Sequence, residues 1–436
     1  MTATGATWRN WSRSQAVVPA RVERPTSTGA VQRAVLAAAR TGTRIKAVGA
    51  GHSFSGIAVA PGVQLDLAFS GVLHVDEAAG RVTLAAGTHL HELPALLKPY
   101  GLALENMGDV DRQTLAGATS TGTHGTGARF RGLTGQIVAV TLVVADGSLL
   151  HVSETENPEL LPAVRLGLGA LGILVDLTLQ CVPAYLLHAV ETPEPFEAVV
   201  DAFAERSDAA DHFEFYWFPH TETVLTKTNT RLPLSAGRAP LGRVSRWIDD
   251  ELIANGVYRA TCAAGVIVPP LVPRVNRLAD RLTGRRDFTD LSHRVFITHR
   301  SVRFHEMEYA LPVEQVPEAL REVRALIQKR GWRISFPLEV RTAAADDIWL
   351  STAHGRATGY IAVHRYFREN PRKYFADVEA IMQAHGGRPH WGKMHDLDAD
   401  ILRAVYPRFD DFLAVRDRLD PERRFSNRYL ERVLGR

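Results

Sequence analysis

The sequence has 436 residues, of which 45% are hydrophobic and 23% are charged. This is an ordinary globular composition, and it excludes disordered, coiled-coil and collagen-like proteins. Fifty-one Lys and Arg residues against 48 Asp and Glu residues leave a net charge of +3, spread along the chain without a basic block. We therefore expect a small-molecule partner and no nucleic-acid surface. The length exceeds what one hydrophobic core usually organises, which favours two domains.

The cysteines and the apolar runs of the sequence indicate in which cellular compartment the protein is expected. Cys181 and Cys262 are far apart and match neither a disulfide framework nor a zinc-ligand spacing, so a reducing, cytoplasmic compartment is expected. The N-terminus has no apolar core of signal-peptide length, and no apolar run approaches the roughly 18 residues of a membrane span. No transmembrane segment is predicted, while peripheral membrane association stays open.

The first part of the chain alternates short β-branched runs with two helical patterns and glycine turns, which is typical of an α+β domain. One helix is predicted to run to Arg40 from a cap at Ser27 or Thr28, and a second to cover residues 88–100. The predicted strands are 45–48, 63–67, 72–75 and 82–85, followed by a hairpin within 140–152.

From about residue 186 the sequence changes to polar stretches and proline clusters, which indicates a second domain. Its predicted strands are 212–218, 302–311, 333–341 and 360–367, and its predicted helices are 313–330 and 371–385. The span from about 230 to 300 is predicted to be irregular.

Gly167, Gly169 and Gly172 spell GLGALG, a formal match to the GxGxxG dinucleotide fingerprint. That fingerprint needs a strand before it and a helix after it, so that the pyrophosphate meets the helix N-terminus. Here a helical pattern precedes the glycines and an alternating strand pattern, 173–182, follows them. The order favours a glycine turn over a Rossmann site, and leaves open a contact of Gly172 and Ile173 with a cofactor bound by other loops.

Two glycine-rich runs carry a stronger signal. GAGHSFSG, at 49–56, directly follows a predicted strand, and GATSTGTHGTG, at 117–127, contains four glycines and four threonines. Such loops can aim several backbone N–H groups at one point, which holds a diphosphate without side-chain charge. Together the two runs predict a site for a large dinucleotide.

The two runs resemble the loops of the vanillyl-alcohol-oxidase (PCMH) type of FAD domain. Further segments are similar to its aldonolactone and alditol oxidase branch: EFYWFP (214–219), EMEYALP (306–312), LEVRT (338–342), HWGKMH (390–395) and FSNRYL (425–430). The resemblance covers essentially the whole chain. It implies an α+β protein with an FAD domain at 15–183, a substrate-binding cap domain with an antiparallel sheet at 184–410, and a segment 411–436 that returns to the FAD domain.

The resemblance also implies covalently bound FAD. In the family, the histidine of the GxGHS loop bonds to the 8α-methyl group of the isoalloxazine ring, and His52 matches it. The second run has no cysteine, so a single attachment is implied. The other implied cofactor contacts are Gly49, Ala50, Gly51, Ser53, Gly117, Ser120, Thr121, Gly122, His124, Gly125, Gly127, Gly172 and Ile173.

Glu339, Arg341 and Lys393 match the family's catalytic residues. Alternation places Glu339 and Arg341 on one face of the strand 333–341, where a solvated ion pair is the alternative reading. By resemblance, Glu339 orients a polyol and contacts substrate together with Arg341 and Lys393. The two cations stabilise the anionic reduced flavin.

Two further substrate contacts are implied, Thr114 and His364, although a structural role for His364 stays open. His390 and His395 lie five residues apart in HWGKMH and lack partners at metal-ligand spacing. No metal site is predicted.

The expected reaction is FAD-dependent oxidation of an aldono-1,4-lactone of the L-gulono or D-arabinono type, by hydride transfer from a carbinol C–H to flavin N5. An alditol oxidase that produces hydrogen peroxide is the alternative. The electrons are expected to pass to oxygen or to a cytochrome- or quinone-type acceptor. Two other classes stay open: an NAD(P)-dependent dehydrogenase built on GLGALG, and a flavin-binding protein without catalysis.

Overall fold

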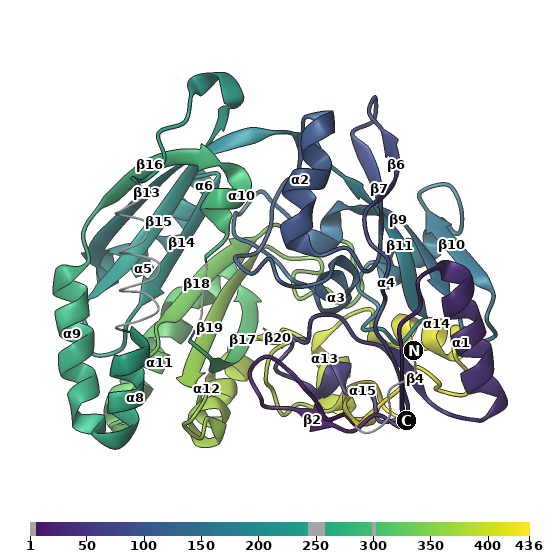
Figure 1. Ribbon diagram of the computed structural model, residues 1–436. Coiled ribbons are helices and arrows are strands. Elements are labelled where there is room, and N and C mark those ends of the chain that lie inside the picture. Colours follow the sequence, from purple (N-terminus) through teal and green to yellow (C-terminus); the bar gives the residue numbers. More distant parts are fainter. Residues whose placement is uncertain (1–5, 243–257, 299–301) are drawn as a thin grey trace.

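An eight-stranded antiparallel sheet is the largest element of the computed structural model, which describes residues 6–242, 258–298 and 302–436 (Figure 1). Its strand order is β16-β13-β15-β14-β18-β19-β17-β20. The strands are β13 (Tyr185–Pro195), β14 (His212–Trp217), β15 (Thr223–Pro233), β16 (Arg286–Leu291), β17 (Phe304–Pro312), β18 (Leu338–Ala343), β19 (Thr358–Tyr366) and β20 (Arg388–Pro389).

Both faces of the middle strands are buried, for two different reasons. One face packs against the helices α5 (Phe196–Asp201), α6 (Phe203–Ala209), α11 (Val316–Arg330) and α12 (Arg372–Ala384). Because side chains alternate along a strand, the neighbouring residues of β17 and β18 point the other way. Those residues include Glu306, Glu308, Glu339 and Arg341, all buried. The sheet therefore has one apolar face and one charged, enclosed face.

The other half of the molecule is built on two smaller sheets (Figure 1). An antiparallel sheet has the order β10-β9-β11-β7-β6, and a parallel sheet has the order β3-β5-β4. The strands are β3 (Arg21–Glu23), β4 (Ile45–Ala47), β5 (Val63–Leu65), β6 (Val72–Asp76), β7 (Arg81–Ala85), β9 (Ile137–Val143), β10 (Leu149–Ser153) and β11 (Ile173–Gln180). Together with the helices and the large antiparallel sheet described above, these strands confirm the predicted α+β fold class.

The last helices of the chain are α13 (Ala399–Val405), α14 (Phe409–Leu419) and α15 (Arg428–Leu434). The segment between α14 and α15 contacts strand β4 near the start of the chain, because the amide of Ile45 donates to the carbonyl of Arg424 at 2.9 Å. Phe425 is fully buried in a cluster with Ile45 and Val31. The two ends of the chain thus share one small core.

Of the two helices predicted in the N-terminal part of the chain, one is present as predicted and the other is much shorter. Helix α1 (Thr28–Arg40) is confirmed, and the Ser27 side chain caps it by accepting from Ala30 N. Residues 88–100 instead form the short helix α2 (Leu93–Leu97) between two 3-10 turns. Pro99 has no N–H to continue the α-helical ladder, so the tighter turn replaces it.

Two predictions for the second part are wrong in detail. The strand predicted at 333–341 begins only at Leu338, because Pro337 cannot donate to a neighbouring strand. The span predicted to be irregular contains β16 and the helices α8 (Tyr258–Ile267), α9 (Val272–Leu282) and α10 (Ser292–Phe296), while 243–257 and 299–301 lie outside the described residues.

GLGALG follows the short helix α4 (Leu161–Val164) and precedes β11, so the reversed order is confirmed. Gly172 has φ +155°, and a Cβ there would lie 2.9 Å from the carbonyl oxygen of Val143. The glycine is needed for this close approach to β9 and not for a helix N-terminus. No helix among the described residues is long and apolar enough to cross a membrane.

Asn427 joins the C-terminal helix to the turn that follows the first glycine run. Its amide nitrogen lies 2.8–3.1 Å from the carbonyl oxygens of Gly56, Ile57 and Val59, and its side-chain oxygen caps α15 by accepting from Leu430 N at 2.9 Å. One buried side chain therefore satisfies both a helix end and a loop.

We expect Asn427→Ala to lower the free energy of unfolding by about 2–4 kcal/mol, because the helix loses its cap and buried carbonyls lose their donor. Chemical denaturation measures this change. Asp398→Ala is the matched control: Asp398 caps α13 but is exposed, so about 1 kcal/mol is expected. Equal losses in the two variants would contradict the assignment.

Candidate active site

Two cavities meet between the halves of the molecule. The first, here called the glycine cleft, has a volume of about 260 Å³ and is lined by the first glycine run, the start of the second and the GLGALG turn. The second, the polar chamber, has a volume of about 320 Å³ and lies against the charged face of the large sheet. The residues that line both are His52, Ser53, Gln113 and Thr121.

Most of the predicted cofactor contacts line the glycine cleft: Gly49, Ala50, Gly51, His52, Ser53, Gly117, Ser120, Thr121, Gly172 and Ile173. Gly122, Gly125 and Gly127 line neither cavity, and His124 lines the polar chamber instead. Thr114, predicted to contact substrate, lies in the glycine cleft, where its hydroxyl caps the helix α3 (Leu115–Thr121).

The walls of the glycine cleft fit a flavin dinucleotide. A Cβ on Gly49 would lie 2.4 Å from the hydroxyl of Thr114, so only glycine lets the two runs come this close. The cleft is thereby lined by backbone, which suits a long ligand held by N–H groups.

Lys46 is a charged residue of the glycine cleft that the sequence patterns missed. Its ammonium donates to the carbonyl oxygens of Gly169 at 3.3 Å and Phe425 at 3.2 Å. Burial lowers the pKa of Lys46 to about 7, although Asp420 acts in the opposite direction. Lys46 is buried next to the buried Ile45 on the short strand β4, so alternation along the strand does not predict its burial.

His52 lies where the two cavities join, and its ring stacks on Trp11 with centroids 5.8 Å apart. Burial, followed by the nearby cations Lys393 and Arg112, lowers the pKa of His52 to about 4. The imidazole is therefore neutral near pH 7 and keeps a nitrogen lone pair.

Arg341 is the centre of a buried cluster of charges in the polar chamber. Its guanidinium contacts Glu339 directly, donates from Nε to Glu214 at 3.0 Å, and lies 3.6 Å from Asp109. Burial opposes the charged form, but these three carboxylates hold the pKa of Arg341 well above its ordinary value. The Tyr216 hydroxyl lies 3.1 Å from Glu339 and 3.2 Å from Glu214, so it links the two carboxylates.

Lys393 forms the second ion pair, with its half-buried side chain against the buried carboxylate of Glu306. Burial acts against both charges. Glu306 nevertheless raises the pKa of Lys393, and Lys393 with His364 lowers the pKa of Glu306 to about 2. The pair is fully charged over the ordinary pH range.

His364 is buried beside Glu306 and does not line the polar chamber. Its Nδ1 donates to the carbonyl of Pro337 at 2.8 Å, its Nε2 lies 3.6 Å from Glu306, and its ring packs edge-on against Phe304. The geometry therefore favours a structural role over the predicted substrate contact.

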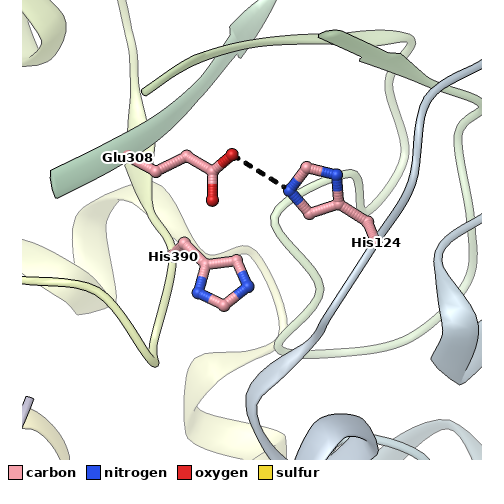
Figure 2. A group of neighbouring side chains, drawn as sticks. All are labelled: His124, Glu308 and His390. Atoms are coloured by element: carbon pink, nitrogen blue, oxygen red, sulfur yellow. Dashed lines mark ion pairs between the residues drawn. The ribbon is translucent and has the colours of Figure 1, made fainter. Parts of the chain in front are cut away.

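His124, Glu308 and His390 converge in the chamber, as Figure 2 shows. Nε2 of His124 lies 3.3 Å from Oε1 of Glu308. His390 faces this pair, but its Nδ1 accepts from the amide of Gly392 at 3.1 Å and its Nε2 lies 3.2 Å from the carbonyl of Gly122. His395 points elsewhere, because its Nε2 pairs with the Tyr429 hydroxyl at 2.9 Å.

The sequence patterns missed most of the partners of the predicted residues. Those are Asp109, Glu214, Tyr216, Glu306 and Glu308. A signal existed for three of them: Glu214 opens EFYWFP, while Glu306 and Glu308 alternate in EMEYALP and so share one strand face. Charged residues on one face of an otherwise apolar strand indicate an enclosed polar site.

The fold has close counterparts among solved structures. A solvent-stable cholesterol oxidase superposes with a TM-score of 0.81 over 99% of this chain and 97% of that chain, at 19% sequence identity. The cholesterol oxidase of B. sterolicum gives a TM-score of 0.80 over 100% of this chain and 97% of its own, at 16% identity. At these identities the likeness establishes a shared fold alone.

Sequence comparison defines the class of protein. Residues 19–153 match the family described as "FAD binding domain", so the chain is an FAD-dependent oxidoreductase. Residues 177–433 match the family described as "D-arabinono-1,4-lactone oxidase". The chain belongs to that family of aldonolactone-oxidising flavoproteins, and the recognition drawn from its motifs is confirmed.

Curated relatives align over nearly their full length. The L-gulono-1,4-lactone dehydrogenase of Mycobacterium tuberculosis is 43% identical over 98% of this chain and 99% of its own. The L-gulonolactone oxidase of Bos taurus is 35% identical, with 98% of each chain covered. An alditol oxidase of Streptomyces is 30% identical, again with 98% of each chain covered.

Replacement of Glu306 tests the Lys393 ion pair. In Glu306→Gln the carboxylate that raises the pKa of Lys393 is gone, so we expect that pKa to fall. Because the lysine loses its charge as pH rises through its pKa, flavin reduction by substrate should decline at correspondingly lower pH. Stopped-flow absorbance over pH 6–11 measures the profile.

Glu314→Gln, at an exposed glutamate in the turn that follows β17, is the matched control and should keep the parent profile. An unchanged alkaline limb in Glu306→Gln would show that Lys393 does not carry the charge on which the reaction depends.

Proposed function

We propose that this protein oxidises a sugar-derived 1,4-lactone, with L-gulono-1,4-lactone as the first candidate, and that its FAD is covalently attached to His52. The observation that carries the proposal is that Glu339, Arg341 and Lys393 line one chamber together with His52. That histidine also lines the glycine cleft, so a flavin held there would extend into the chamber. When bound, FAD supplies a hydride acceptor at N5 of its isoalloxazine ring.

Different residues of the polar chamber bind the substrate and stabilise charge. Glu339 accepts hydrogen bonds from substrate hydroxyls and fixes the reacting carbon. Arg341 and Lys393 stay charged in a buried site, so they stabilise negative charge that develops beside them. Neither cation needs to move, because carboxylates already hold both in place.

The charge of the polar chamber supports a neutral substrate. Its lining contains the acids Asp109, Asp111, Glu306, Glu308 and Glu339 against the cations Arg112, Arg341 and Lys393. An aldonate carboxylate would therefore meet excess negative charge and lose its hydration without a free cation to pair with. A lactone or an alditol carries hydroxyls and no charge, and fits this lining.

The relatives favour a lactone over an alditol. Those named for L-gulonolactone are 43% and 35% identical, whereas the alditol oxidase is 30% identical. Oxidation of an alditol with release of hydrogen peroxide remains the second candidate. The same names include a dehydrogenase and oxidases, so oxygen and a cytochrome- or quinone-type acceptor both belong in the test.

The neutral imidazole of His52 supports the covalent link, because a bond to carbon requires a free nitrogen lone pair. We expect acid-precipitated protein to stay yellow and His52→Ala to release its flavin into the supernatant. His89→Ala is the matched control, since His89 also lines the glycine cleft but should leave the flavin attached. Yellow supernatant from the parent protein would refute the link.

A substrate panel tests the reaction. L-gulono-1,4-lactone and D-arabinono-1,4-lactone should bleach the flavin under anaerobic conditions, xylitol and sorbitol more slowly, and L-gulonate not at all because of its charge. Flavin absorbance measures the rate, and parallel assays with a dye and with oxygen, following peroxide, identify the acceptor class.

Glu339→Gln should lower the rate of flavin reduction by roughly a hundredfold or more. Bleaching by none of the lactones or alditols would defeat the proposed function, while full activity of a Glu339→Ala, Arg341→Ala double variant would defeat the site assignment alone.

A further inference from the structure

Oxidation of a secondary alcohol releases a proton as well as a hydride, and the residues assigned so far leave that proton without an acceptor. Glu339 is paired with Arg341, and Glu306 with Lys393. Both carboxylates are thus engaged by a cation, and Lys393 with His364 lowers the pKa of Glu306 to about 2, which makes it a weak base. The acceptor must be another group that lines the polar chamber.

His124 and Glu308 both line the chamber, and two hydrogen-bond acceptors face each other in this pair. Nδ1 of His124 lies 2.8 Å from the carbonyl oxygen of Gly125, so that nitrogen carries the hydrogen. In a neutral ring Nε2 is then an acceptor. It faces Oε1 of Glu308, a second acceptor, at 3.3 Å (Figure 2). Two acceptors at this separation are stable only with a proton or an O–H donor between them.

The separation is longer than that of a direct bond between the two side chains. A direct charge-assisted N–H···O bond measures about 2.7–2.9 Å, whereas these atoms are 3.3 Å apart. Both side chains are nine-tenths or more buried, and the His124 ring is held by a stack on Tyr360 with centroids 3.7 Å apart. The two side chains are therefore held with Nε2 of His124 directed at Oε1 of Glu308.

The charged and titratable groups around the pair are all accounted for. Lys393 and Glu306 face it as a neutral ion pair, and the Tyr360 hydroxyl is occupied by Thr352 at 2.9 Å. His390 is occupied at both ring nitrogens, and burial lowers its pKa to about 4. His364 has a similar arrangement beside Glu306, but its ring does not line the polar chamber, whereas both His124 and Glu308 do.

We propose that His124 accepts the hydroxyl proton of the substrate and that Glu308 holds the resulting imidazolium; this inference rests on the proposed function. The O–H bond breaks and Nε2–H forms on His124. The C–H electron pair leaves as hydride to flavin N5, and the C–O bond becomes a carbonyl. Glu308 stays a carboxylate throughout and accepts from the new Nε2–H, so it acts as a positioning residue for the imidazolium.

A metal ion is the competing occupant of this cluster, because one ligand atom from each of His124, Glu308 and His390 lies within 4.8 Å of the others. The hydrogen bonds argue against it. A metal on His390 would displace either the Gly392 amide or the Gly122 carbonyl, and the Lys393 ammonium already supplies a cation beside Glu308. Two ligands then remain, fewer than a protein metal site uses.

The first test reads protonation without turnover. In oxidised, substrate-free protein with ¹⁵N-labelled histidine, His124 should show a pyrrole-type Nδ1 and a pyridine-type Nε2 at alkaline pH, and should gain a proton at Nε2 as pH falls. Its signal is assigned by its loss in His124→Gln. In Glu308→Gln the ¹⁵N signal of Nε2, compared at the same pH, should move toward that of a neutral ring, because the imidazolium loses its counter-charge. His390 serves as an internal reference that stays neutral.

The second test is kinetic. His124→Gln should lower the rate of flavin reduction by roughly 10²–10⁴-fold with a small change in KM, and should remove the acid limb of the pH profile. Glu308→Gln should move that limb to lower pH. Retention of attached flavin with a parent-like absorbance spectrum shows that the variants fold.

The outcomes separate this inference from the proposed function. If lactones fail to bleach the parent protein, the proposed function fails. If the parent is bleached and His124→Gln reacts at the same rate, or His124 takes up no proton at Nε2, the His124 assignment fails alone. One transition-metal ion per chain, removed by EDTA together with activity, would also overturn it.

Discussion

Arg341 lies buried on the inner face of the large sheet, and it keeps its charge only because neighbouring carboxylates surround it. Taking an unpaired guanidinium out of water costs several kcal/mol, and a pair recovers this only with good geometry. That geometry comes from strand register: Tyr216 on β14 stands opposite Glu339 on β18, and Arg341 opposite Tyr360 on β19. A slip of one residue would turn the charges toward the helices and the apolar side chains toward the chamber. The core and the site therefore specify the same register.

The second ion pair depends on a different kind of contact. The segment that carries Lys393 docks on β17 through its backbone, with His390 N donating to the Glu308 carbonyl at 3.0 Å and Met394 N to the Glu306 carbonyl at 2.9 Å. The same two glutamates present their side chains to the chamber. Backbone and side chain of β17 thus act together, so the distance from Lys393 to its partner is set by main-chain hydrogen bonds and not by a flexible lysine stem.

The residues that a local pattern can identify were predicted, and those that depend on cross-strand pairing were not. His52 follows from a glycine run, and the shared face of Glu339 and Arg341 follows from alternation, both sharpened by family resemblance. Glu214 and Glu306 come from strands that lie far from their partners in sequence, so no window of the chain contains both members of a pair. His124 sits in a glycine run, and only the fold reveals that its ring turns from the cleft into the chamber. Likewise, Pro99 and Pro337 explain after the fact why a helix and a strand end where periodicity would continue them.

The meeting of the two chain ends has a consequence for the order of events during synthesis. Lys46 stands six residues before His52 in the sequence. Its ammonium nevertheless donates to the carbonyl of Phe425, 379 residues further along the chain. During translation, the N-terminal half emerges from the ribosome long before Phe425 is added. The wall of the glycine cleft is therefore incomplete while most of the chain is being translated. We therefore expect the cofactor to be fixed in place only after this last part of the chain is made, and a chain that stops before Phe425 to be unable to retain it.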